Sequence, residues 1–100
     1  MTGNGFDRDI RFEIVKHIGV LSTHSTGWKK ELNLVAWNGG KPKYDIREWD
    51  IDHEHMTRGI TLHEKEAAQL LKSLAGEFIE HKQLNELGID NELLLGFLGE

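Results

Sequence analysis

Cysteine is absent from this chain of 100 residues, proline occurs once, and no long apolar run is present. Without cysteine the chain can form neither a disulfide framework nor a thiolate zinc site, which excludes a disulfide-stapled secreted domain, a zinc finger and a cysteine-dependent enzyme. No run approaches the ~20 apolar residues of a membrane span, and the first residues lack the features of a signal peptide. We therefore expect one small cytoplasmic domain, or a domain with a tail, without a membrane partner.

Basic residues are also scarce, because 12 Lys and Arg face 17 Asp and Glu and give a net charge of -5. Taken as a total, this charge argues against nucleic acid as a partner. The charge is unevenly distributed, however: residues 16–47 hold six basic and two acidic side chains, a local charge of +4, whereas residues 61–100 hold three basic and eight acidic ones, a local charge of -5. This asymmetry is compatible with a basic surface backed by acidic helices, although a solvated acidic helix face would also explain it.

Alternation of apolar and polar residues predicts four strands, over residues 11–23, 28–38, 41–49 and 59–62. In the first of them Gly19 is a candidate position for a bulge. Asn38-Gly39-Gly40 supplies the positive-φ residues of a tight hairpin, so the second and third strands should pair antiparallel. Pro42 lies at the start of the third strand, where a missing N–H is tolerated.

Apolar residues at helical spacing predict an amphipathic helix over about residues 64–81, with one apolar stripe facing the sheet. Its first turn could be capped by Thr61 with Glu64 or by His63, and the sequence leaves both open. The leucine-rich segment from residue 83 predicts a turn at Gly88 and a short second helix, which covers the core or strengthens a dimer, the alternative being a docking helix for another protein. Four strands followed by a helix make the fold class α+β.

The alternation also separates two chemistries on the second and third strands. If Leu32, Leu34, Ala36 and Ile46 lie under the helix, the opposite face displays Lys29, Val35, Trp37, Lys43, Arg47 and Trp49. Cations pair with phosphates and exposed rings stack on bases, so this basic, aromatic face suits single-stranded nucleic acid, whereas a double helix offers no unstacked base. The alternative is that Trp37 and Trp49 cap a second hydrophobic patch or a dimer contact.

The run Lys43-Tyr-Asp-Ile-Arg-Glu-Trp49, followed by Arg58-Gly-Ile-Thr-Leu62, resembles the positive cofactor four family of transcriptional coactivators, particularly its bacterial YdbC-type branch. The resemblance extends over roughly residues 11–78, and includes the segment over residues 27–33, the Trp37-Asn38 hairpin and the loop over residues 52–56 in the same order. It implies a curved four-stranded antiparallel sheet followed by a helix (ββββα), dimerisation mainly through that helix, and a concave sheet surface that binds single-stranded DNA without strict sequence preference.

The resemblance further implies which residues bind the strand. The hairpin aromatic falls on Trp37, the arginine of Asp-Ile-Arg on Arg47, and the basic residue before Gly-Ile on Arg58. Lys41, Lys43 and Trp49 match neighbouring family positions, and three residues match the bacterial branch alone, namely Trp28, Lys29 and Lys30. The helix residues expected in the dimer contact or the core are Leu70, Leu71, Leu74 and Phe78.

We accordingly expect a flexible lead over residues 1–10, a single-stranded-nucleic-acid-binding domain over residues 11–82, and an apolar helical extension over residues 83–100 that nothing in the family matches. His53-Glu54-His55 beside Asp52 lacks the helical His-Glu-x-x-His register, so a polar turn is preferred to a metal site. No nucleophile follows a strand in an elbow and no Gly-rich loop precedes a helix, so we expect neither an enzyme nor a cofactor.

The predicted function is non-sequence-specific binding of single-stranded DNA by a homodimeric transcription coactivator or regulator, with the transcription machinery as a further partner. A bacterial protein with this function would be associated with the nucleoid. RNA stays open as a ligand, because stacking and phosphate contacts do not sense the 2′-hydroxyl. The alternative function is a protein-interaction module that recruits transcription or repair proteins, with nucleic-acid binding incidental.

Overall fold

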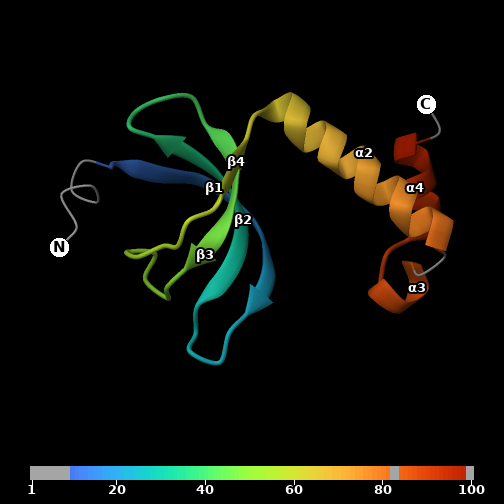
Figure 1. Cartoon of the computed structure of the whole chain (residues 1–100), viewed down its shortest axis with the longest axis horizontal. Coiled ribbons are helices and arrows are strands. Elements are labelled where there is room, and N and C mark those ends of the chain that lie inside the picture. The colour runs from blue at the N-terminus through green and yellow to red at the C-terminus, as the bar shows by residue number, and fades with distance from the viewer. Residues whose placement is uncertain (1–9, 82–83, 99–100) are drawn as a thin grey trace. The chain divides into compact units, whose positions relative to one another are not determined.

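The computed structural model describes residues 10–81 and 84–98 (Figure 1). Its strands are β1 (Phe12–Thr23), β2 (Lys29–Trp37), β3 (Lys43–Trp49) and β4 (Ile60–Leu62), and its helices are α2 (Glu64–His81), α3 (Leu84–Leu87) and α4 (Asn91–Leu98). The strands form one curved antiparallel sheet in the order β1-β2-β3-β4, as Figure 1 shows. The predicted α+β class with a ββββα order is confirmed, and the C-terminal segment holds two short helices where one was predicted.

The chain divides into two compact units, Met1–His63 with the sheet and Glu64–Glu100 with the helices. This division falls at the start of α2, and the boundaries expected at residues 10 and 82 stay predictions. Most of the expected lead over residues 1–10 lies outside the described residues. Among the residues that the structure describes, no helix is long and apolar enough to cross a membrane.

Bulges set the faces of β1. Its antiparallel register with β2 shifts between Ile14 and Lys16, between His17 and Gly19, and between Val20 and Ser22. Each bulge adds an unpaired residue and increases the local twist. As a result Ile14, His17 and Val20, which are three residues apart, face the same side of the sheet as their β2 partners. Strict alternation would instead have placed residues two apart on that side.

The predicted tight turn between β2 and β3 is confirmed. Asn38 and Gly39 have φ values of 53° and 78°, and the amide of Gly40 donates to the carbonyl of Trp37 at 2.9 Å. A two-residue turn with positive φ at both central residues has a backbone twist that matches the twist of the flanking strands. Asn38 also ties the turn to the start of β1, because its amide donates to the Arg11 carbonyl at 2.6 Å and its Oδ1 accepts from the Arg11 amide at 2.8 Å.

The helical unit has its own small core. Ala75 of α2 and Leu94 of α4 are buried, and three partly buried side chains pack against them, namely Phe78, Ile79 and Ile89. The C-terminal part of the α2 stripe therefore packs on α4. The N-terminal part differs, because Leu70, Leu71 and Leu74 are exposed at 40, 45 and 45%.

Candidate nucleic-acid interface

The odd-numbered residues of β2 and β3 share one face of the sheet, as alternation predicted. The register pairs Glu31 with Arg47, Asn33 with Asp45 and Lys29 with Trp49 directly across the two strands. We call this surface the odd face; β1 contributes Ile14, His17 and Val20 to it. The predicted separation of the strands into two faces is thus confirmed.

The expectation that the odd face is the exposed one is wrong. It is the more buried face, since Glu31, Asn33, Val35, Asp45 and Trp49 are all buried on it. The residues expected in the core are instead partly accessible, namely Leu32, Leu34, Ala36 and Ile46. The reason is tertiary: the start of β1 and the loop after β3 both pack against the odd face, through the contacts described below.

Trp49 illustrates this reversal. Its side chain is fully buried at 0% exposure, with its ring centre 5.0 Å from that of Phe12 and 5.6 Å from that of His53. Its indole Nε1 has no hydrogen-bond acceptor within the described part of the chain. The expectation that Trp49 is displayed for stacking on a base is therefore wrong, and Trp49 is a core residue of the sheet unit.

Arg47 is held on the odd face by its neighbours. Its Nε and Nη2 donate to the two carboxylate oxygens of Asp45 at 2.6 and 2.8 Å, and Nη1 donates to the carbonyl of Thr57 at 3.3 Å. Thr61 of β4 also donates to Asp45, at 2.9 Å. The guanidinium lies over the Trp37 ring, 4.6 Å from its centre. A bidentate pair combined with a cation–π contact fixes both the position and the plane of the guanidinium, so Arg47 and Trp37 form a fixed platform whose positive charge is partly balanced by Asp45.

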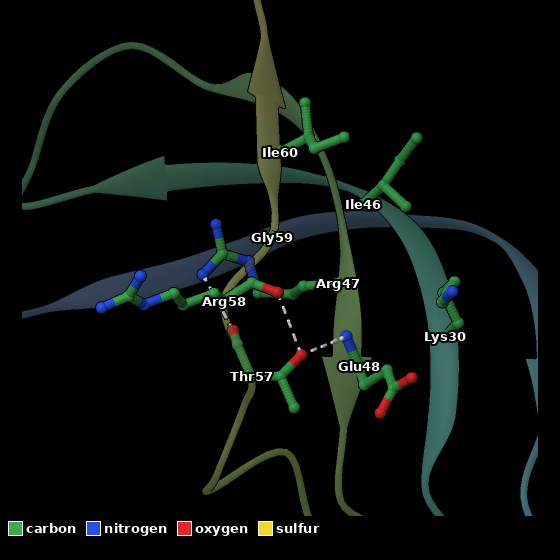
Figure 2. A pocket seen from close by; sticks show the side chains of 8 residues that line it. All are labelled: Lys30, Ile46, Arg47, Glu48, Thr57, Arg58, Gly59 and Ile60. Atoms are coloured by element: carbon green, nitrogen blue, oxygen red, sulfur yellow. Dashed lines mark hydrogen bonds between the residues drawn. The ribbon is translucent and has the colours of Figure 1, made fainter.

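A glycine brings a second arginine beside this platform. A Cβ on Gly59 would lie 2.3 Å from the Ile46 carbonyl oxygen and 2.4 Å from the Cβ of Arg47, so the approach of β4 to β3 requires glycine. In Figure 2 the side chains of Arg47 and Arg58 extend in the same direction, away from Lys30. Arg47, Arg58 and Lys30 all line a cavity of about 230 Å³ at the β3–β4 edge. The Arg58-Gly59-Ile60 motif therefore brings Arg58 to the same cavity as Arg47.

The other predicted binding residues do not all share this surface. Lys29 and Lys43 are exposed at odd-numbered positions, whereas Lys30 is paired across the strands with Glu48 on the opposite face. Trp28 is half-buried just before β2, and Lys41 is exposed just before β3. The odd face thus gathers Lys29, Trp37, Lys43 and Arg47 with Arg58 alongside. Lys30 lies on the opposite face but lines the same cavity as Arg47 and Arg58.

A polar cluster on the odd face was missed by sequence reasoning. The Glu31 carboxylate, only 4% exposed, accepts from Asn33 Nδ2 at 3.0 Å and from His53 Nε2 at 3.0 and 3.1 Å. His17 Nδ1 lies 2.8 Å from Asn33 Oδ1 and 3.6 Å from Glu31. Burial would raise the pKa of Glu31, but hydrogen bonds from Asn33 and His53 and the charges of His53 and His17 hold that pKa below its ordinary value. The sequence signal for this cluster was the pair of polar residues Glu31 and Asn33, which lie two apart on the same face of β2 as Val35.

The loop after β3 delivers His53 to this cluster. Asp50 accepts from the amides of Glu54 and His55 at 2.8 and 3.1 Å, and His55 Nδ1 lies 2.8 Å from its second oxygen. His53 takes a φ of 59°, in the left-handed region. The hydrogen bond from His55 lowers the pKa of Asp50, which burial opposes only in part. Within the described residues no cluster of three or more metal-ligating side chains is arranged to hold an ion.

Comparison with known proteins places this chain in a family. The model of the transcriptional coactivator p15 (PC4) family matches residues 24–73. An uncharacterized protein of Treponema pallidum (strain Nichols) is 40% identical over 68 residues, which cover 68% of this chain and 80% of that protein. The chain belongs to the transcriptional coactivator p15 (PC4) family.

The family assignment confirms the resemblance seen in the sequence. The matched segment contains every residue predicted to bind nucleic acid, from Trp28 to Arg58, together with Glu31, Asn33 and His53 of the polar cluster. It does not contain His17 or the helices beyond α2. The PC4 family is a nucleic-acid-binding, non-enzymatic family of transcriptional coactivators, and residues 24–73 of this chain match its model.

Proposed function

We propose that this PC4-family protein binds single-stranded DNA on its odd face, without strict sequence preference, and thereby acts as a transcription coactivator or regulator. The observation that carries the proposal is the Trp37–Arg47 platform with Arg58 beside it. Cationic groups bind the phosphates of a flexible strand while a neighbouring aromatic ring stacks on one of its bases. The proposal extends to a homodimer, for which Leu70, Leu71 and Leu74 offer an exposed apolar surface.

Phosphate binding falls chiefly to side chains other than Arg47. Nε, Nη1 and Nη2 of Arg47 each donate within the protein, and its side chain is 13% exposed. Lys29, Lys43 and Arg58 are exposed, so they carry the mobile charges that follow a phosphate backbone. Arg47 then acts mainly by holding Trp37 in place and by adding a fixed positive charge.

A second function, recruitment of another protein, is favoured by a different observation. Val15, Ile18, Val20 and Leu21 of β1 are exposed between 42 and 55%, an unusual concentration of apolar side chains on an edge strand. A protein-interaction function would use this strand and would be indifferent to the cations of the odd face.

Fluorescence anisotropy separates the two functions. A labelled oligo-dT strand and a duplex of equal length are titrated at ~50 and ~200 mM salt, because phosphate contacts require affinity to fall steeply with salt. We expect micromolar or tighter binding of the single strand, weakened at least tenfold in the double variant Lys43→Ala with Arg58→Ala. Lys65→Ala, an exposed lysine on α2, is the matched control and should bind as the wild type does. Equal binding of duplex, or binding that ignores salt, would refute the proposal.

A further inference from the structure

The polar cluster of the odd face borders a cavity of about 400 Å³. Ile14 and Val20 of β1 form its apolar wall, and Glu31 and Asn33 of β2 form its polar floor, between His17 and His53. Lys29 of β2 completes the lining and is its cationic member. Its volume lies in the range of pockets that take small planar ligands, and an apolar wall with a few convergent polar groups is their usual composition. Because Glu31 lies directly across from Arg47, the cavity opens on the same sheet face as the Trp37–Arg47 platform.

The hydrogen bonds determine which polar groups the cavity presents. Asn33 donates from Nδ2 to Glu31, so its Oδ1 faces His17 and His17 must carry its proton on Nδ1. His53 Nε2 faces only carboxylate oxygens of Glu31, so it too must be protonated there. In the neutral form of each ring the second nitrogen, His17 Nε2 or His53 Nδ1, is an acceptor; in the charged form that lowers the pKa of Glu31 it is a donor. The Glu31 carboxylate accepts at Oε1 from Asn33 and His53 and at Oε2 from His53 alone, so Oε2 keeps a lone pair for a further donor. Apart from the Lys29 ammonium, the polar groups that the cavity offers are therefore mainly acceptors.

We propose that this cavity receives one base of the bound strand and favours bases that carry an exocyclic amino group, as cytosine, adenine and guanine do, over thymine or uracil. The inference rests on the proposed function, since it concerns the same odd face. A carboxylate accepts hydrogen bonds from an amino group such as cytosine N4, whereas thymine presents a carbonyl oxygen at that position. An ionised carboxylate on a phosphate-binding face repels phosphates, and a base amino group is the part of a nucleotide that it attracts.

The test compares strands that differ in one edge of the base. Oligonucleotides of about 12 nucleotides are made of 5-methyldeoxycytidine or of thymidine. Both bases carry the methyl group, and they differ only at the C4 substituent, an amino group or a carbonyl oxygen, and at N3, an acceptor or an N–H donor. Binding of both strands is measured in the same buffer. We expect the 5-methyldeoxycytidine strand to bind about fivefold or more tightly than the thymidine strand.

Glu31→Gln is the decisive variant, because its amide both donates and accepts and so accommodates the thymine carbonyl. We expect the preference for 5-methyldeoxycytidine to disappear or reverse in this variant. Lys43→Ala is the matched control, which should weaken both strands by the same factor because it removes a phosphate contact. Circular dichroism and urea unfolding establish that each variant is folded.

Each outcome decides one of the two proposals. Equal affinity of the wild type for the two strands overturns the base subsite and leaves single-strand binding standing. A preference that persists unchanged in folded Glu31→Gln overturns the role of Glu31. Absence of binding to either strand refutes the proposed function itself. If Glu31→Gln does not fold, the comparison of the two strands with the wild type still decides whether the protein distinguishes the amino group from the carbonyl oxygen. NMR chemical-shift changes of the His17 and His53 side chains on addition of cytidine or thymidine monophosphate then show whether the base enters this cavity.

Discussion

The guanidinium carbon of Arg47 lies 4.6 Å from the centre of the Trp37 ring, on the adjacent strand. This contact depends on a third residue, because Asp45 holds the guanidinium by two hydrogen bonds from the buried side. The pair therefore couples the stability of the sheet to the cationic surface proposed to bind DNA. Substitutions at Arg47 must be interpreted with stability and affinity measured together.

Arg47→Ala should lower the free energy of unfolding by about 3 kcal/mol, because it leaves the buried Asp45 without its cationic partner. Urea denaturation monitored by tryptophan fluorescence measures the loss. Arg58→Ala, which removes an exposed arginine, should change the same quantity by less than about 0.5 kcal/mol. Equal effects of the two substitutions would contradict the ion pair's structural role.

Trp49→Phe and Trp37→Ala distinguish a core tryptophan from an interface tryptophan. Trp49→Phe keeps an aromatic ring in the core and removes an indole N–H that lacks an acceptor among the described residues, so single-strand affinity should stay within about twofold. Trp49→Ala should cost about 3–5 kcal/mol of folding stability, as truncation of a buried aromatic does. Trp37→Ala should weaken binding by about 1–3 kcal/mol, the range for loss of a stacked base. A larger affinity loss in folded Trp49→Phe than in Trp37→Ala would reverse the assignment.

Two glycine-to-alanine changes should act with opposite sign. Gly59→Ala forces a methyl group against the Ile46 carbonyl and Arg47, and should cost about 1–3 kcal/mol of folding stability. Gly76→Ala adds a methyl group to open space within α2, and should stabilise by about 0.5–1 kcal/mol through helix propensity. Thermal denaturation of both variants against the wild type measures the shifts. A tolerated Gly59→Ala would show that β4 can move away from β3.

Glu31 should make the fold sensitive to acid. Its pKa is lower in the folded chain than its ordinary value of 4.5, so the carboxylate contributes stability that is present above that value. This contribution is lost as the pH falls below 4.5 through the folded-state pKa. The difference between the urea midpoints at neutral pH and at acid pH should therefore be smaller in Glu31→Gln than in the wild type. Parallel pH profiles for the two proteins would count against an ionised, hydrogen-bonded Glu31.

The exposed leucines of α2 should mediate self-association. Replacing Leu71 or Leu74 with Lys places a charge on the apolar surface expected between two copies. Light scattering at micromolar concentration should then give a monomer where the wild type gives a dimer, with helix content unchanged by circular dichroism. Lys72→Ala, on the same helix, is the control and should remain dimeric. A monomeric wild type would contradict the homodimer.

The sequence by itself determined the local elements of this protein. Period-two alternation located β2 and β3 to within two residues, helical spacing placed α2 at its observed bounds, and Asn38-Gly39 located the hairpin turn. These are consequences of nearest-neighbour geometry, which composition and spacing encode directly. The ordered motifs around Arg47 and Arg58 also led to the family, because matching residues at matching spacing is a property of the chain alone.

The tertiary structure alone decided which face of the sheet is buried and what lies on it. Alternation separates two faces but is symmetric between them, so the burial of Trp49 depended on Phe12 and on the loop that carries His53. The number of bulges in β1 could not be predicted from the sequence pattern. These bulges turn His17 toward Asn33 and bring it close to Glu31. Charge summed along the chain likewise could not tell that Asp45 neutralises part of the basic face. Contacts between residues distant in sequence form only when loops close and strands shift register, and that is why the polar cluster became visible only in the folded chain.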